Sequence, residues 1–215
     1  MTNTEPSPEI QGTGKTCQRF DVRERIVHWL AALSFAYAAL SGLALWSPHV
    51  YWLAAVLGGG ATVRGWHPWG GVVFALVLGV MFRRWAGQMR LDADDRRWLR
   101  LAHRYARHDD AELPESGRFN AGQKVLFWTQ SLSALLLLAS GVVLWLPEMM
   151  PRALRLAAVL IHPLAAVISI GAIILHIYMG TAGVPGAFRS MIRGWVTPGW
   201  ARAHHAKWYR RISGR

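Results

Sequence analysis

The sequence predicts an all-α membrane protein, a bundle of four transmembrane helices with both termini on the cytoplasmic side. Two observations support this fold class. Of the 215 residues, 53% are hydrophobic, and they gather into long blocks instead of spreading along the chain as the core of a soluble domain does. The Lys and Arg residues, in turn, concentrate in three of the segments outside these blocks, which is typical of a polytopic membrane protein.

Each of four apolar blocks is close to the roughly 20 residues that cross about 30 Å of hydrocarbon. The blocks are residues 26–46, 66–82, 125–146 and 157–181. The apolar residues 50–57 end at the helix-breaking run Gly58-Gly59-Gly60, so we expect a short interfacial helix there. His67-Pro68 and His162-Pro163 lie near the starts of their blocks, which predicts that each proline occupies a first helical turn.

The distribution of positive charge sets the expected orientation. Four Lys or Arg precede the first block, ten lie between the second and third, and seven follow the fourth, whereas the other two connections hold three. Positive residues mark the cytoplasmic side, so we expect a cytoplasmic N-terminal tail at 1–25, a transmembrane domain at 26–181 with a cytoplasmic loop at 83–122, and a basic cytoplasmic tail at 182–215.

The net charge of +12 follows from the same distribution. Because the charges flank membrane spans, they favour contact with anionic lipid and argue against a nucleic-acid partner. The N-terminal tail has no apolar core followed by a cleavage site, so we expect the first block to persist as a helix.

Four histidines fall near the ends of the apolar blocks. His28 lies at the cytoplasmic start of the first, His67 at the outer start of the second, and His162 at the outer end of the fourth. His176 follows fourteen residues later, which is about 3.9 turns and about 21 Å of helix. The spacing therefore predicts two imidazole pairs at opposite depths, His67 with His162 outside and His28 with His176 inside.

Paired imidazoles at two depths indicate metal ligation inside the bundle. Neutral imidazole binds transition metals, and haem iron accepts two axial ligands. A zinc site would need three or four ligands at one depth, and the four blocks contain no Asp, Glu or Cys. We therefore expect two bis-histidine b-type haems. The alternative is that each histidine is a packed or interfacial residue of a haem-free membrane anchor or small transporter.

Glycines inside the blocks are consistent with room for flat rings, although they also serve close helix packing. These glycines are Gly42, Gly70, Gly71, Gly79, Gly141 and Gly171. The remaining histidines lie in loops or tails, where we expect solvated or interfacial side chains. They are His49, His103, His108, His204 and His205.

Five stretches of the chain resemble one known family. They are "RFDVRERIVHW", "WHPWGGVV", "RFNAGQKVLFW", the span "IHP…LHIYMG" and the tail "WARAHHAKWYRR". Over roughly residues 19–211 the chain resembles the gamma (cytochrome b556) subunit of respiratory membrane-bound formate dehydrogenase. Cytochrome b subunits of membrane-bound NiFe hydrogenases have similar openings and are the alternative, against which the "NAGQK" segment argues.

The resemblance implies a four-helix cytochrome of the bacterial inner membrane with two haems b. By position, His67 and His162 would bind the outer haem, and His28 and His176 the inner haem. The chain would carry no catalytic residue for formate, which a molybdenum or tungsten alpha subunit oxidises. Electrons would arrive from an iron–sulfur beta subunit, because Cys17 is the sole cysteine of this chain, and would leave to a quinone, menaquinone or ubiquinone. Relatives often assemble as trimers of the whole complex.

The resemblance also implies a quinone pocket beside the inner haem. Its residues would be Asn120, Gly122, Gln123, Met179 and Gly180. Asn120 would hydrogen-bond a quinone carbonyl, and Gly122 would let the ring approach the backbone. The alternative is that Asn120 caps the third helix and that Lys124 anchors it to lipid headgroups.

Overall fold

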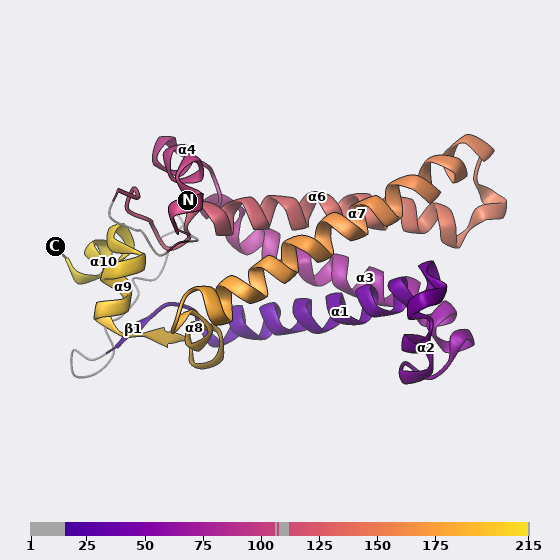
Figure 1. Ribbon diagram of the computed structural model, residues 1–215, viewed down its shortest axis with the longest axis horizontal. Helices are drawn as coiled ribbons and strands as arrows, with labels where there is room; N and C mark the ends of the chain where they lie inside the picture. The colour runs from indigo at the N-terminus through magenta and orange to yellow at the C-terminus, as the bar shows by residue number, and fades with distance from the viewer. Residues whose placement is uncertain (1–15, 106, 108–111, 215) are drawn as a thin grey trace, which may run out of the picture. The chain divides into compact units, whose positions relative to one another are not determined.

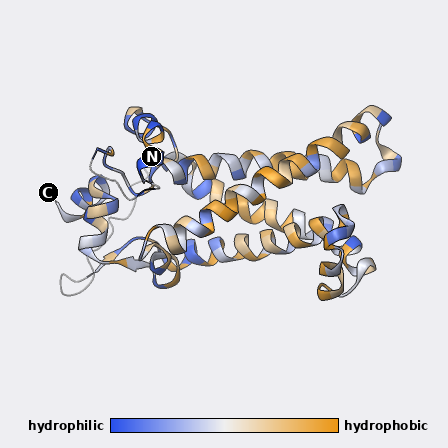
Figure 2. Cartoon of the chain, viewed as in Figure 1, coloured by the Kyte–Doolittle hydropathy of each residue, from blue (hydrophilic) through white to orange (hydrophobic). Residues whose placement is uncertain are grey.

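Four long helices dominate the computed structural model, which describes residues 16–105, 107 and 112–214 (Figure 1). They are α1 (Val22–Trp46), α3 (Gly60–Trp85), α6 (Ala121–Trp145) and α7 (Arg152–Tyr178). Each is long and apolar enough to cross a membrane, and hydrophobic residues run along all four (Figure 2). The predicted all-α fold with four spanning helices is confirmed.

The chain divides into two compact units. The first comprises the described residues of Met1–Arg25, Gly87–Phe127 and Leu175–Arg215, and the second comprises Ile26–Ala86 and Trp128–Ile174. In the second unit, Phe74, Leu78 and Ala134 form a buried cluster between α3 and α6. Large apolar side chains also cover the outside of this unit; Leu160, for example, is 73% exposed. An apolar exterior of this extent is expected where lipid is the solvent.

The first long helix begins several residues before the first apolar block because a capping pair defines its start. Asp21 and Glu24 form a reciprocal cap on α1: Asp21 Oδ1 accepts from the Glu24 backbone N at 2.7 Å, and the Asp21 N donates to Glu24 Oε2 at 2.9 Å. This pair satisfies two otherwise unbonded donors at the helix start. The first helix therefore starts at Val22, where hydropathy alone predicted residue 26.

The expected break before the second span is confirmed. Gly58 and Gly59 adopt φ of 91° and 97°, a left-handed region that favours glycine, and they separate the short α2 (Trp52–Val56) from α3. The 3-10 helix η1 (Pro48–Val50) precedes α2. Because α3 already starts at Gly60, the prediction that Pro68 occupies a first turn was wrong, and Pro68 lies inside the helix.

The same correction applies to the fourth span. α7 starts at Arg152, shortly after the 3-10 helix η3 (Pro147–Met149), so Pro163 also lies inside its helix. Membrane helices tolerate interior prolines because neighbouring groups can satisfy the freed carbonyl. α7 ends in a π-helical turn, η4 (Met179–Gly183).

The first unit folds the predicted tails together with the middle segment. β1 (Cys17–Gln18) pairs antiparallel with β2 (Trp195–Val196), and Cys17, Val196, Ala201 and Trp208 form a buried core. The smaller helices of this unit are η2 (Ala86–Gln88, at its edge), α4 (Ala93–Arg100), α5 (Ala102–Tyr105), α8 (Ala187–Arg193), α9 (Pro198–His204) and α10 (Ala206–Ser213).

Ion pairs join the three parts of the first unit. Arg118 Nη2 donates to both carboxylate oxygens of Glu24, at 2.8 and 2.7 Å, and to the backbone O of Arg19 at 2.7 Å. Lys207 pairs with Asp94, and Arg210 pairs with Glu115. Two cations of the basic C-terminal segment are thus engaged by acids of the middle segment.

Candidate functional site

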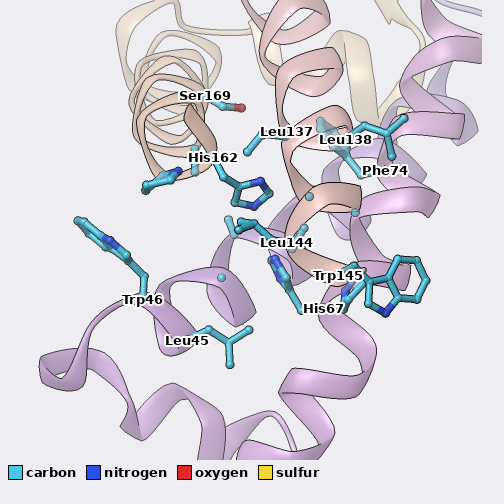
Figure 3. Close-up of a pocket in the computed structure, with 18 of the residues that line it drawn as sticks. Leu45, Trp46, His67, Phe74, Leu137, Leu138, Leu144, Trp145, His162 and Ser169 are labelled. Carbon is cyan, nitrogen blue, oxygen red and sulfur yellow. The ribbon is translucent and has the colours of Figure 1, made fainter. Parts of the chain in front are cut away.

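An apolar cavity of about 630 Å³ lies inside the second unit (Figure 3). All four long helices contribute to its wall, with bulky side chains such as Phe74, Leu138 and Trp145. Its polar lining residues include His67, His162 and Ser169. A mostly apolar cavity of several hundred Å³ with a few convergent polar groups is typical of a cofactor site.

His67 of α3 and His162 of α7 face one another in this cavity (Figure 3). Their ring centres are 6.2 Å apart, and the ring planes are inclined by 76°. An imidazole nitrogen binds a transition metal at about 2.0–2.1 Å and lies about 1.1 Å from its ring centre, so two rings on opposite sides of one metal ion have centres about 6 Å apart. The observed separation matches this arrangement.

A serine of a neighbouring helix holds each ring. Ser41 Oγ lies 2.9 Å from His67 Nδ1, and Ser140 Oγ lies 2.9 Å from His162 Nδ1. With Nδ1 engaged in this way, Nε2 is the nitrogen that can bind a metal ion. The donor set of the cavity is therefore two imidazole Nε2 atoms.

Two imidazoles fit haem better than they fit an isolated metal ion. Among the described residues there is no group of three or more His, Cys, Asp or Glu side chains that would hold an ion. Two imidazoles would be sufficient to hold a haem iron, because the tetrapyrrole ring supplies the other nitrogen ligands. The apolar wall suits the faces of such a ring. The residues present therefore fit a bis-histidine haem.

Three of the glycines singled out in the sequence line this cavity: Gly42, Gly71 and Gly141. A Cβ at Gly42 would lie 3.1 Å from His67 Cε1, and a Cβ at Gly141 would lie 3.3 Å from His162 Cε1. These two glycines make room for the imidazoles. A Cβ at Gly70 would instead lie 2.6 Å from the ring of Tyr37, so Gly70 serves helix packing.

His28 and His176 lie in different units. His28 is in the N-terminal part of α1 and belongs to the second unit, whereas His176 is near the end of α7 and belongs to the first. The pairing of these two histidines therefore stays a prediction.

All five predicted quinone-pocket residues belong to the first unit. Asn120 and Gln123 form a reciprocal cap at the start of α6: the Gln123 N donates to Asn120 Oδ1 at 2.9 Å, and the Asn120 N donates to Gln123 Oε1 at 3.0 Å. The capping role considered for Asn120 is thus confirmed. Because Oδ1 accepts from the backbone, Nδ2 is the group with which Asn120 can donate to a ligand.

The other pocket candidates differ in their surroundings: a Cβ at Gly180 would meet nothing within 4 Å, whereas Gly122 has a close neighbour. The Trp98 ring would meet a Cβ at Gly122 at 3.5 Å, so it covers this glycine. Met179 and Gly180 are half-buried in the π-helical turn. Lys124 is buried, and its Nζ donates to Asp95 Oδ2 at 2.5 Å and to the Arg90 carbonyl at 3.1 Å. The alternative that Lys124 anchors lipid headgroups was therefore wrong.

Arg19 adds a cation near this cap. Its Nη2 donates to Gln123 Oε1 at 3.4 Å and to the Arg118 carbonyl at 3.0 Å. Burial, together with the nearby charge of Arg118, lowers the pKa of Arg19 to about 9. The guanidinium therefore stays protonated at neutral pH.

Among the histidines of the loops and tails, His205 differs most from the expected solvated or interfacial side chain. Its side chain is buried, its Nδ1–H donates to the Gly117 carbonyl at 2.7 Å, and its ring packs against Trp200 and Trp208. The prediction of a solvated or interfacial ring was wrong for this residue. His108 lies outside the described residues.

Ser41 and Ser140 were missed by the sequence reasoning, although a signal was present. The segment "SGLALWSP" at 41–48 matches "SGVVLWLP" at 140–147 in Ser, Gly, Leu, Trp and Pro. Each segment ends one helix, and a His-Pro pair lies in the next spanning helix. The repeat extends well beyond the shared His-Pro pair noted from the sequence.

A four-helix membrane bundle with two facing imidazoles in an apolar cavity defines a membrane-embedded cytochrome of the b type. The comparison with protein families agrees: residues 19–194 match the model of the prokaryotic cytochrome b561 family. The chain belongs to this family. A b-type haem is therefore its cofactor, and the protein is a multi-pass protein of the bacterial inner membrane.

Within this family, the chain is similar to the cytochrome subunits of formate dehydrogenases. The chain is 38% identical over 202 residues to the cytochrome b556(fdo) subunit of formate dehydrogenase from Escherichia coli K12, with 92% of this chain and 93% of the relative covered. It is 33% identical to the nitrate-inducible cytochrome b556(Fdn) subunit of the same organism, with 88% of each covered. A cytochrome b556 subunit from Haemophilus influenzae is 31% identical, with 86% and 79% covered. The resemblance recognised in the sequence is confirmed.

Proposed function

We propose that this chain is the membrane cytochrome b subunit of a formate dehydrogenase and carries electrons from an iron–sulfur partner to a quinone. The facing pair His67 and His162 inside an apolar cavity carries the proposal. The similarity to three formate dehydrogenase subunits supports the choice of complex over a hydrogenase. Formate oxidation to carbon dioxide, which releases two electrons and a proton, belongs to a separate molybdenum or tungsten subunit.

Two haems b are part of the proposal. A bound haem supplies reversible one-electron transfer between ferric and ferrous iron. His67 and His162 would hold one haem through their Nε2 atoms, in a cavity with a mostly apolar wall. His28 and His176 would hold the other on the cytoplasmic side, as the spacing within α7 supports. Two ligand pairs at opposite depths provide an electron path across the membrane.

The quinone site is proposed beside the inner pair. Asn120 donates from Nδ2 to a quinone carbonyl, while its Oδ1 stays in the helix cap. Gly122, Gln123, Met179 and Gly180 complete the pocket in the same unit. A quinone takes up two electrons and two protons to become the quinol. Because this site is on the cytoplasmic side in the proposed orientation, the protons come from the cytoplasm and the reaction charges the membrane.

The orientation has its own support and test. We propose that residues 1–25, 83–122 and 182–215 face the cytoplasm and that 26–181 form the membrane domain, because cations cluster in the three outer segments. A fluorescent-protein fusion at the C-terminus should fluoresce, whereas an alkaline phosphatase fusion there should be inactive. An active phosphatase fusion would reverse the orientation.

The decisive experiment is a reduced-minus-oxidised optical spectrum of the purified chain with haem measured per polypeptide. We expect a b-type spectrum and about two haems per chain. His67→Ala and His162→Ala should each remove the same haem, and His28→Ala and His176→Ala the other. His49→Ala is the matched control, since His49 is exposed in η1. A folded chain with no haem would favour a haem-free anchor and overturn the proposal.

The partner assignment is tested separately by the subunits that co-purify. A tagged chain isolated from its native membrane should bring down a molybdenum- or tungsten-containing formate-oxidising subunit and an iron–sulfur subunit. Recovery of a nickel–iron subunit would assign the chain to a hydrogenase.

A further inference from the structure

Two helix pairs in the second unit carry the same arrangement of serine, glycine and histidine. Ser41 of α1 contacts His67 of α3, and Ser140 of α6 contacts His162 of α7, each with 2.9 Å between Oγ and Nδ1. The glycine after each serine faces Cε1 of the same ring, so that a Cβ would come within 3.1 and 3.3 Å of it. Each imidazole is thus placed by two consecutive residues of the adjacent helix.

The direction of these hydrogen bonds follows from the other contact of each serine. Ser41 Oγ lies 2.6 Å from the Tyr37 carbonyl, and Ser140 Oγ lies 2.6 Å from the Leu136 carbonyl. A carbonyl can only accept, so the single hydroxyl proton points at it. The serine oxygen must then accept from the histidine, because otherwise two acceptor oxygens would meet at 2.6 Å with no proton between them.

This assignment fixes the tautomer of both histidines. Nδ1 carries the proton, and Nε2 carries the lone pair that a metal ion requires. A hydrogen bond from the non-ligating nitrogen also restrains rotation of the ring and increases the basicity of the ligating nitrogen. Ser41 is fully buried and Ser140 is 6% exposed, so water does not compete with either bond.

We propose that Ser41 and Ser140 are positioning residues for axial ligation of the outer haem by His67 and His162. The proposal rests on the haem ligation proposed above. Each serine selects the Nδ1–H tautomer, holds the ring in the ligating orientation and increases electron donation to the iron. Stronger donation favours the ferric state, so the two hydroxyls lower the reduction potential of the outer haem.

A serine that bonds only the carbonyl four residues earlier is common in membrane helices, and α1 contains a control for that role. Ser34 Oγ bonds the Leu30 carbonyl at 2.8 Å and the Ala31 carbonyl at 3.1 Å. This geometry resembles that of Ser41 toward Tyr37 and Ala38. Ser34 does not line the haem cavity, so Ser34→Ala reports the loss of a back-bond alone.

The test compares Ser41→Ala, Ser140→Ala and Ser34→Ala in the purified, haem-loaded full chain. The readouts are a redox titration, the low-spin electron paramagnetic resonance signals and the rate of haem transfer to excess apomyoglobin. We expect Ser41→Ala and Ser140→Ala each to move one of two haem waves to higher potential and to change one low-spin signal. We also expect about 10- to 100-fold weaker haem retention at that site. Ser34→Ala should match the unmodified chain.

Conservative variants keep the test informative if an alanine variant folds poorly. Ser41→Thr and Ser140→Thr retain the hydroxyl and should restore the potential and the signal. Ser41→Cys and Ser140→Cys keep the approximate size with a weaker acceptor and should shift the potential in the same direction as alanine. Unchanged potential, signal and haem retention in the serine variants would overturn the proposal, as would an equal change in Ser34→Ala.

The histidine variants distinguish an error in the haem ligation from an error in the positioning role of the serines. If His67→Ala and His162→Ala both retained two haems, the ligand assignment itself would be wrong. If instead the histidine variants lose one haem while the serine variants behave like the unmodified chain, the ligation stands and the positioning role falls.

Discussion

Gln130 and Ser169 exchange hydrogen bonds between α6 and α7 in the buried part of the second unit. Gln130 Nε2 donates to the Ser169 backbone O at 3.0 Å, and Ser169 Oγ donates to Gln130 Oε1 at 2.7 Å. Ser169 is fully buried, and Gln130 is nearly so. Ser169 lies seven residues from both His162 and His176, about two helical turns from each. This polar pair therefore joins the two helices midway between the predicted ligand levels.

Removing one member of this pair should destabilise the second unit. Side-chain hydrogen bonds between membrane helices are worth about 0.6–1.7 kcal/mol, so we expect Gln130→Leu and Ser169→Ala each to cost about 1 kcal/mol. The double variant should cost less than the sum, since neither partner is then left buried without the other. Reversible unfolding in detergent measures these values. Strict additivity would show that the two side chains are not energetically coupled.

Closing the space beside His67 should weaken the outer haem site. In Gly42→Ala the new methyl group would lie 3.1 Å from His67 Cε1, and the ring would have to move. We expect about 10-fold faster haem loss at one site, in line with other disturbances of ligand support. Gly79→Ala is the control, because nothing lies within 4 Å of a Cβ there. Equal haem retention in the two variants would mean that the ring adjusts without cost.

Breaking the contact between Glu24 and Arg118 should destabilise the first unit. The Glu24 side chain is 6% exposed and that of Arg118 is 23% exposed, so the pair is largely shielded from water. Loss of one partner from a buried pair costs about 3–5 kcal/mol. We expect up to about 3 kcal/mol for Glu24→Gln, because Arg118 keeps some contact with solvent. The exposed pair of Arg210 and Glu115 is the comparison, and Glu115→Gln should have little measurable effect.

Acidification should destabilise the first unit through His205. Burial lowers the pKa of His205 well below its usual 6.5, and the charges of Arg19 and His204 lower it further. The hydrogen bond to the Gly117 carbonyl acts in the opposite direction and raises the pKa. The unfolded chain therefore binds the proton more readily than the folded one does. The stability that the neutral ring contributes is complete above about pH 6.5 and is lost as the pH falls through the lower folded pKa.

Thermal unfolding midpoints between about pH 7.5 and about pH 4.5 test this effect. We expect His205→Asn, which keeps a donor for the Gly117 carbonyl, to flatten the pH dependence in this range. His49→Asn should leave it unchanged, because His49 is exposed. A slope that persists in His205→Asn would assign the acid sensitivity to another group.

Hydropathy and spacing were sufficient for the features that depend on periodicity. The four spans and the facing of His67 and His162 follow from block lengths and from depth in the membrane. Hydropathy did not predict where α1 and α6 begin. Capping by Asp21 with Glu24 extends α1 beyond its apolar residues, and capping by Asn120 with Gln123 extends α6. The interior positions of Pro68 and Pro163 were mispredicted for a related reason, since polar residues precede them in the same helices.

Contacts between segments that are far apart in the chain were the hardest features to predict from the sequence. A serine in a membrane helix is usually satisfied by its own helix, so nothing at Ser41 or Ser140 alone indicates a histidine partner. The repeat of Ser-Gly and Leu-Trp was the available signal. The burial of His205 depends on Gly117, far away in the chain, and on the rings of Trp200 and Trp208. That burial could not be read from a segment rich in Lys, Arg and His.

His67 and His162 lie in two helices, α3 and α7, that are far apart in the sequence, and this separation has a consequence for biogenesis. His67 is translated in the first third of the chain and His162 in the last third, and chains emerge at about 5–20 residues per second. His67 is therefore synthesised several seconds before His162. On the proposed ligation, the outer haem site would lack its second imidazole until most of the chain has been synthesised. Loading of the cofactor would then act as a late checkpoint that distinguishes finished chains from truncated ones.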